Sequence, residues 1–164
     1  MKYISTYASP IGKIILCSNG EFLTHLFFDG QKYSEVYLEG DATQKELPVF
    51  REASKWLDEY FCGRYPGFFS QIKLCGTPFQ LSTWELLRKI PYGKTVTYGQ
   101  LAHEICRQTG KEKMSAQAVG GAVGRNPISI IVPCHRVIGT DGSFTGYAGG
   151  TDKKQVLLKL EKII

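Results

Sequence analysis

The stretch Ser115-Ala116-Gln117-Ala118-Val119-Gly120-Gly121-Ala122-Val123-Gly124 is almost free of bulky side chains. Ser115 is a favoured N-cap residue, so the stretch predicts a short helix over 116–123 that ends at Gly124. An earlier helix is expected from the capping residue Thr97 through Cys106, with a polar loop between the two. Two short neighbouring helices in a basic segment are typical of a helix-turn-helix domain.

The adjacent glycines Gly120 and Gly121 need an explanation, because each costs about 1 kcal/mol relative to alanine inside a helix. One explanation is close packing against another helix of the same domain. The other is a helix narrow enough to enter a groove of DNA. A helix that reads bases in the major groove normally presents several long polar side chains. Only Gln117 is of that kind here, so sequence-specific recognition is not expected.

Gly76-Thr77-Pro78 marks the boundary between two predicted domains, 1–76 and 77–164. Thr77 is a good N-cap and Pro78 suits the first helical position, so a helix should start here and end at Pro91-Tyr92-Gly93. The last helix of the chain is expected over 152–163.

The first domain is predicted to hold a small antiparallel sheet, because alternating segments are separated by turn-forming residues over about 2–7, 13–17 and 22–28. Apolar spacing predicts a helix over 48–61, and a strand near 69–74 is expected to rejoin the sheet. The expected fold class is α+β: an N-terminal α/β domain, then a mostly helical, winged-helix-like domain with a helix-turn-helix.

Pro133-Cys134-His135-Arg136-Val137 follows the apolar run 128–132, which predicts a buried strand. The Cys134 thiol is therefore expected at the floor of a site. A thiol is a weak nucleophile until it loses its proton, and a neighbouring imidazole is a common way to form the thiolate near neutral pH. A cysteine hydrolase would also use such a pair, but it would need an oxyanion hole and multiple turnovers.

The net charge of +5 is unevenly distributed along the 164 residues. Residues 1–76 hold eight Lys/Arg against nine Asp/Glu, whereas residues 77–164 hold twelve against six. A polyanion-binding second half would show this excess, and so would a solvated basic face.

Several function classes are not expected from the composition. No apolar stretch approaches the ~18 residues of a membrane span, and residues 1–5 lack a signal-peptide core, so a cytoplasmic location without membrane contact is expected. Five widely spaced cysteines argue against a disulfide framework and fit a reducing compartment. They form no CxxC pair, so a zinc site is not expected. The sequence also shows no signature of another metal or a nucleotide, so no cofactor is expected.

The Pro133–Val137 segment resembles the active-site signature of the O6-alkylguanine-DNA alkyltransferases, also called methylated-DNA–protein-cysteine methyltransferases. The resemblance covers residues 77–164 and extends loosely to the N-terminal sheet. The other motifs that carry it are Thr77-Pro78-Phe79-Gln80 with Trp84, Ile90-Pro91-Tyr92-Gly93, Thr97-Tyr98-Gly99-Gln100-Leu101-Ala102, Ala118-Val119-Gly120, Asn126-Pro127 and Thr145-Gly146-Tyr147-Ala148-Gly149-Gly150. Together and in this order they are highly specific.

The resemblance implies a protein that flips an O6-alkylated guanine out of double-stranded DNA and moves the alkyl group irreversibly onto Cys134. His135 would act as the base, polarised through a water by Glu161 in the last helix. Tyr98 would contact the rotating phosphate and protonate the leaving guanine, and Asn126 would brace the turn before the strand. Each molecule would react once, without a cofactor, and a monomer is expected. Without the resemblance, Glu161 would be interpreted as an exposed helix residue and Tyr98 as a buried aromatic.

The resemblance also implies contacts with the base and the DNA, with the recognition helix in the minor groove. The loop around Tyr147 would close over the extruded base, and the carbonyls of Cys134 and Val137 would accept from its amine. Arg136 would tie the segment to its surroundings, and Lys154 would lie near the site, although a solvated surface lysine is the simpler interpretation. The residues expected at the base or DNA are Gln117, Ala118, Gly120, Gly121, Arg125, Arg136, Val137, Tyr147, Ala148, Gly149 and Lys154.

One position departs from the family pattern, which usually has an arginine where this chain has Gln117. Glutamine can fill the gap left by the flipped base but lacks the charge and the planar cation, so weaker DNA retention or slower flipping is expected. Two other protein classes share parts of this pattern. A lesion-binding alkyltransferase-like protein would have another residue in place of Cys134, and a helix-turn-helix regulator would need base-reading side chains on its third helix.

Overall fold

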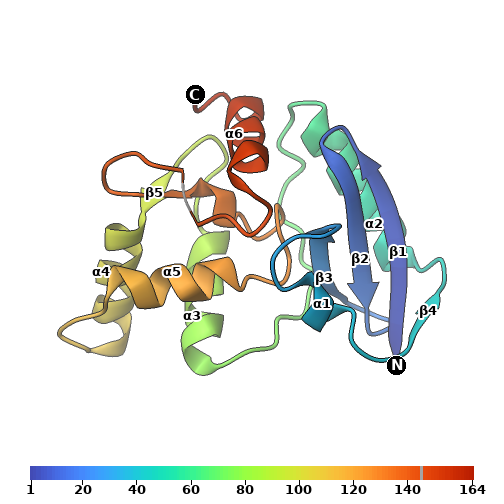
Figure 1. The fold of residues 1–164 in the computed structure, drawn as a ribbon, viewed down its shortest axis with the longest axis horizontal. Coiled ribbons are helices and arrows are strands. Elements are labelled where there is room, and N and C mark those ends of the chain that lie inside the picture. The colour runs from blue at the N-terminus through green and yellow to red at the C-terminus, as the bar shows by residue number, and fades with distance from the viewer. Residues whose placement is uncertain (145) are drawn as a thin grey trace. The chain divides into compact units, whose positions relative to one another are not determined.

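The computed structural model describes residues 1–144 and 146–164, which form two compact units, Met1–Cys75 and Gly76–Ile164 (Figure 1). Thr145, the first residue of the last motif quoted above, lies outside the described residues.

The first unit is built on a four-stranded sheet with the strand order β3-β2-β1-β4. β1 (Lys2–Ser9), β2 (Gly12–Ser18) and β3 (Leu23–Phe28) pair antiparallel, as predicted. β4 (Ala42–Gln44) lies parallel to β1 and was not expected, since all of its residues are exposed and show no alternation. The strand predicted over 69–74 is reduced to one parallel bridge between Leu23 and Ile72.

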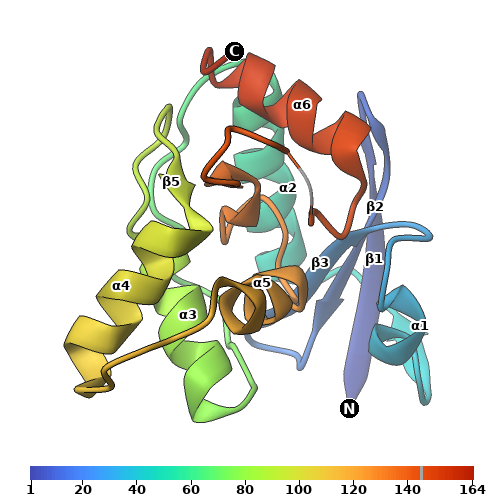
Figure 2. The same cartoon turned by 60° about the vertical axis from the view of Figure 1, so that its left-hand side comes forward.

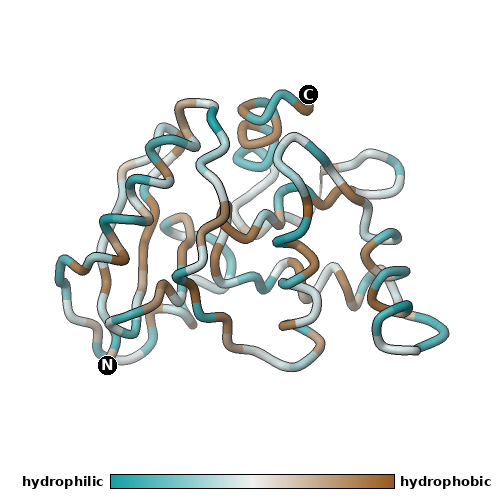
Figure 3. The backbone as a smooth tube through the Cα atoms, turned by 180° about the vertical axis from the view of Figure 1, so that it is seen from behind, coloured by the Kyte–Doolittle hydropathy of each residue, from teal (hydrophilic) through white to brown (hydrophobic). Residues whose placement is uncertain are grey.

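The helix α2 (Pro48–Phe61) has the predicted bounds and packs against the first three strands. Brown hydrophobic and teal hydrophilic stretches follow one another along it (Figure 3). Its apolar stripe is buried and comprises Val49, Phe50, Ala53, Trp56, Leu57 and Tyr60. The short helix α1 (Ser34–Tyr37) lies in the connection between β3 and β4.

Helices dominate the second unit: α3 (Pro78–Arg88), α4 (Tyr98–Thr109), α5 (Ala116–Gly124) and α6 (Thr151–Leu160). α5 lies against α3 and α4, in the arrangement of a helix-turn-helix (Figure 2). The short strands β5 (Val96–Thr97) and β6 (Val137–Ile138) pair in parallel and bring the start of α4 beside the segment that follows Cys134. The predicted α+β fold class is confirmed.

Side-chain caps start α3, α4 and α5 at the predicted residues. Thr77 and Thr97 each form a capping box with the glutamine three residues later, and Ser115 caps α5. The predicted ends are less accurate. α4 continues past Cys106 until Gly110, whose left-handed φ of 73° closes the helix. α6 ends at Leu160 instead of residue 163, and Lys162 beyond it has a left-handed φ of 61°.

The apolar run 128–132 is buried as predicted, but the prediction of a strand is wrong. All five residues are described: Ile128 makes a single bridge, residues 129–131 form a turn in which Ile130 has a φ of 71°, and Val132 lies in a bend. Asn126 satisfies the backbone of these turns: its amide donates to the carbonyl of Val132 at 2.8 Å and accepts from the N–H of Ile128 at 3.0 Å. Apolar content alone does not distinguish buried turns from a short buried strand.

Candidate active site

Cys134 begins a single 3₁₀ turn (Cys134–Arg136) directly after these buried turns, and the residue is only 5% exposed. Burial raises the pKa of its thiol. A hydrogen bond with the Asn126 side chain and the positive charge of Lys154 act in the opposite direction. The thiolate would therefore have two stabilising neighbours in a place that bulk water hardly reaches.

His135 and Glu161 are buried and in direct contact, with 2.5 Å between Nε2 and Oε2. The expectation of a water between them is therefore wrong, and so is the alternative of an exposed Glu161. Glu161 also follows α6 instead of lying within it. A carboxylate at Nε2 favours the tautomer with its hydrogen there, which leaves the Nδ1 lone pair to accept a proton. Burial lowers the pKa of His135, so the ring is neutral near pH 7.

The Glu161 carboxylate has two further donors. Its Oε1 accepts from Nε of Arg136 at 2.8 Å and from the backbone N–H of Gly93 at 3.0 Å. Burial alone would raise the pKa of Glu161, but its hydrogen bonds with His135 and Arg136 and its electrostatic interactions with both residues lower that pKa to about 2. The group is thus an anion at every physiological pH.

Arg136 is in turn held by the loop after α3. Its Nη1 donates to the carbonyl of Ile90 at 2.7 Å, and its guanidinium lies 5.6 Å from the centroid of the Tyr92 ring. These contacts are with the protein itself and agree with the expected role of tying the segment to its surroundings.

Lys154 on α6 is fully buried, and its Nζ donates to the carbonyl of Val137 at 2.5 Å. The alternative of a solvated surface lysine is therefore wrong. Desolvation lowers the pKa of Lys154 to about 8, and the nearby Cys134 only partly opposes this. The ammonium also lies 6.0 Å from the ring centroid of Tyr98.

Tyr98 and Tyr147 lie close enough to Cys134 to interact with it electrostatically. Burial, and then the neighbouring cysteine, raise the pKa of both phenols. Gly146 has a φ of 85°, and a Cβ at that position would come within 2.9 Å of the Tyr98 hydroxyl. Glycine therefore lets the loop pass next to Tyr98. Ala148 and Gly149 follow in a half-buried turn.

The outer face of α5 is made of small and polar residues. Its exposed residues include Gln117, Ala118 and Gly121, and the exposed Arg125 caps the C-terminal end. A Cβ on Gly120 would meet the Tyr98 ring at 3.8 Å, an ordinary contact. A Cβ on Gly121 would have no described atom within 4 Å, so packing within the described chain does not explain this glycine.

Sequence reasoning missed the part that Ile90 and Gly93 play in this site. Both belong to a motif quoted above, but the helix pattern presented them only as a helix end. Ile90 acts through its carbonyl and Gly93 through its N–H, so their side chains carry no chemical signal.

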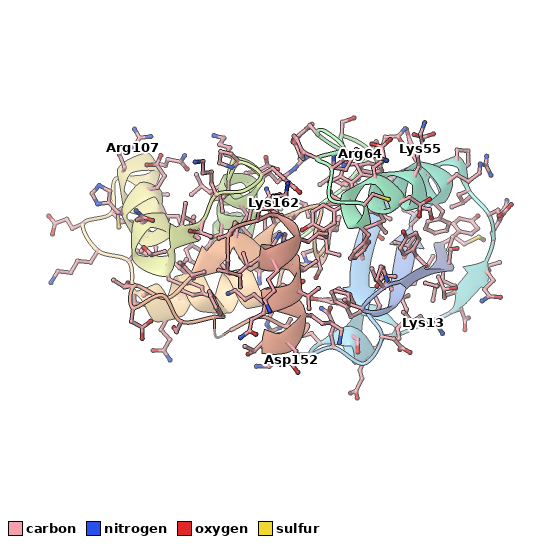
Figure 4. All side chains as sticks on the ribbon, turned by 90° about the horizontal axis from the view of Figure 1, so that it is seen from above. Lys13, Lys55, Arg64, Arg107, Asp152 and Lys162 are labelled. Atoms are coloured by element: carbon pink, nitrogen blue, oxygen red, sulfur yellow. The ribbon has the colours of Figure 1, made fainter. Side chains whose placement is uncertain are left out.

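Charged side chains of this unit such as Arg107 and Asp152 lie on its exterior (Figure 4). In residues 1–144 and 146–164, no group of three or more His, Cys, Asp or Glu side chains is placed to hold a metal ion. Within the same ranges, no helix has the length and apolar character needed to cross a membrane. All five cysteines are free thiols.

Comparison with known proteins gives consistent matches along the whole chain. The DNA binding domain of 6-O-methylguanine DNA methyltransferase matches residues 78–163, and the ribonuclease-like domain of the same protein matches residues 2–74. A methylated-DNA–protein-cysteine methyltransferase of Methanosarcina acetivorans is 48% identical over 97% of both chains. One from Haemophilus influenzae is 43% identical over 98% of this chain and 87% of its own. The crystal structure of Mycobacterium tuberculosis OGT in complex with DNA has a TM-score of 0.86 at 42% identity, and covers 98% of this chain and 92% of that one. The chain belongs to the 6-O-methylguanine DNA methyltransferase family.

Proposed function

We propose that this protein repairs double-stranded DNA by moving the alkyl group of O6-alkylguanine, chiefly O6-methylguanine, onto the sulfur of Cys134. The observation that carries the proposal is the buried contact at 2.5 Å between Glu161 and His135, the residue next to Cys134. A thiol, a neutral imidazole and a carboxylate in this order form a thiolate by proton transfer.

The step balances without a co-reactant. The Nδ1 of His135 takes the thiol proton, directly or through a water, and the sulfur attacks the alkyl carbon. The bond between that carbon and guanine O6 breaks, and guanine leaves as it gains a proton. Tyr98 is the proposed donor, because its phenol lies near Cys134 and, with a pKa raised by burial, carries its proton at neutral pH. The thioether is not hydrolysed under cellular conditions, so each molecule reacts once.

The target base has to leave the duplex, because a stacked base cannot reach a thiol in a residue that is 5% exposed. The open space over Gly121 and the small side chain of Ala118 suit a helix that enters the minor groove, where little sequence is read. Gln117 would fill the gap left by the base, and Arg125 would bind phosphate.

The extruded base is proposed to lie between the Cys134 segment and the turn Tyr147–Gly149. The carbonyls of Cys134 and Val137 would accept from its amine. The Val137 carbonyl already accepts from Lys154, but a carbonyl oxygen has two lone pairs and can take a second donor. Asn126 and Arg136 would support the segment from behind.

We expect the protein to act as a monomer in the cytoplasm. The five free thiols support a reducing compartment, because such thiols persist there.

The test is incubation with a duplex that carries a single O6-[methyl-³H]guanine. We expect one label per protein molecule, lost in Cys134→Ala and retained in the matched variant Cys62→Ser, whose thiol is exposed in the other unit. Release of methanol with repeated turnover would instead indicate a hydrolase. Tight binding without label on the protein would indicate a lesion-binding protein.

A further inference from the structure

The two oxygens of Glu161 have separate partners. Oε2 faces Nε2 of His135 at 2.5 Å, whereas Oε1 accepts from Arg136 at 2.8 Å and from the Gly93 N–H at 3.0 Å. The carboxylate cannot rotate without losing hydrogen bonds, which are costly to leave unmade in a buried site. Its orientation toward His135 is therefore set from the Oε1 side.

Arg136 is the charged member on that side, and it is fixed at two points. Its Nε binds Glu161, while its Nη1 binds the Ile90 carbonyl at 2.7 Å. The Tyr92 ring lies beneath the guanidinium at 5.6 Å. A lysine ammonium could replace the charge but not these two diverging hydrogen bonds, because it is a point charge without a fixed fork.

We infer that Arg136 is a positioning residue for alkyl transfer, which orients Glu161 and compensates its negative charge so that His135 stays a neutral base beside Cys134. The kinetic part of this inference rests on the proposed function. The role goes beyond tying the segment in place, because it assigns to Arg136 control over when the imidazole can take a proton.

The charges around His135 explain how Arg136 affects the pKa of the imidazole. Glu161 favours the imidazolium form, whereas Arg136 from its own turn and Lys154 from α6 oppose it. Around Glu161 lie His135, Arg136 and the Tyr92 phenol of the loop after α3. Removal of the guanidinium would leave the negative charge of Glu161 less compensated. The pKa of His135 would then rise, and the ring would be protonated, and useless as a base, at a higher pH.

The first test compares single-turnover methyl transfer by wild type, Arg136→Gln and Arg136→Lys from pH 5.5 to 8.5. In Arg136→Gln we expect the acid limb of the rate profile to move up by about one pH unit, so that the ratio of rates at pH 8 and pH 6 grows up to about tenfold. Arg136→Lys should be slower at every pH with its acid limb near that of wild type. A uniform loss of rate in Arg136→Gln, or the same shift in Arg136→Lys, would overturn the inference.

Trp84→Phe is the matched control for lost stability. It removes another buried hydrogen bond of the same unit, from the indole to the Ala122 carbonyl at 2.8 Å, without a change of charge. Its acid limb should coincide with that of wild type, and a shift of similar size would show that the profile reports only loosened packing.

The second test does not depend on the variants or on repair. The ¹⁵N chemical shifts of His135 in the free wild-type protein should report a neutral ring with its hydrogen on Nε2 from pH 6 to 8. A ring that is protonated at pH 7, or one with its hydrogen on Nδ1, would overturn the inference even if the variants failed to fold. A wild-type protein that transfers no methyl group but shows this tautomer would refute the proposed function and the kinetic part of the inference, and would leave only the arrangement of Arg136, Glu161 and a neutral His135 standing.

Discussion

Glu161 joins His135, Arg136 and the Gly93 backbone through one buried carboxylate, and its acidity should be visible in the stability of the protein. Its pKa is lowered from 4.5 to about 2. A carboxyl whose pKa is depressed by folding stabilises the folded state above its unfolded pKa and loses that contribution as the pH falls through the folded value.

The free energy of unfolding should therefore fall by roughly 3 kcal/mol between about pH 4.5 and pH 2 through this group alone. Glu161→Gln should be less stable at neutral pH and should lack this part of the decline. Urea unfolding of both proteins at pH 6, 4 and 2.5 measures the difference. Parallel declines would show that Glu161 does not carry the effect.

Gln117 is the second residue for which we predict a measurable effect, on DNA affinity. Gln117→Arg should bind duplex DNA about tenfold more tightly at low salt, and the slope of log affinity against log salt should steepen by about 0.9 if the new cation neutralises one phosphate. Fluorescence anisotropy over a salt series measures both quantities. Gln108→Arg adds the same charge on an exposed position of α4 and serves as the control. An equal gain in both variants, or no gain, would contradict a special place for residue 117.

At the scale of a helix, α5 contains a glycine that lowers the stability of the protein but is expected to favour DNA binding. Gly121→Ala should stabilise the protein by about 1 kcal/mol, because alanine is the better helix former and its Cβ meets no described atom within 4 Å. The same methyl group should weaken DNA binding by keeping the helix from the groove floor. Thermal melting and a binding titration test the pair of effects. Ser54→Ala in α2, which should gain stability through helix propensity alone, ought to leave DNA binding unchanged.

The helix bounds and the buried turns also show which features the local sequence can predict and which it cannot. The starts of α3, α4 and α5 could be predicted because a capping side chain lies within three residues of the N–H that it accepts from. α4 ends later than apolar spacing predicts, because the helix continues through polar residues until Gly110 closes it. α6 ends earlier than predicted, because apolar spacing continues to Ile163 although the helix stops at Leu160. The apolar run 128–132 predicts a strand, but its backbone is held in a turn by hydrogen bonds with the Asn126 side chain, which the apolar residues themselves do not indicate.

At the scale of the whole molecule, the product of the reaction should be less stable than the reactant. Transfer adds a methyl group at a residue that is 5% exposed, and overpacking of this kind typically costs about 1–3 kcal/mol. The melting temperature of the methylated protein should fall by roughly 3–10 °C. Calorimetry before and after reaction with excess damaged duplex measures it. Cys134→Ala treated in the same way should keep its melting temperature, and an unchanged value in the reacted wild type would show that the site has room for the group.

The sequence by itself determined the meander, α2, the capped helix starts, the excess of positive charge in residues 77–164 and the motif around Cys134. These features depend on neighbours along the chain, through caps, periodicity and turn residues. Only the tertiary structure decided that Glu161 touches His135 directly across 26 positions, that Arg136 reaches the Ile90 carbonyl across 46, and that Lys154 is buried. A charged side chain can be buried only where other segments supply its hydrogen-bond or ion-pair partners. Local sequence patterns do not predict which distant segments come into contact.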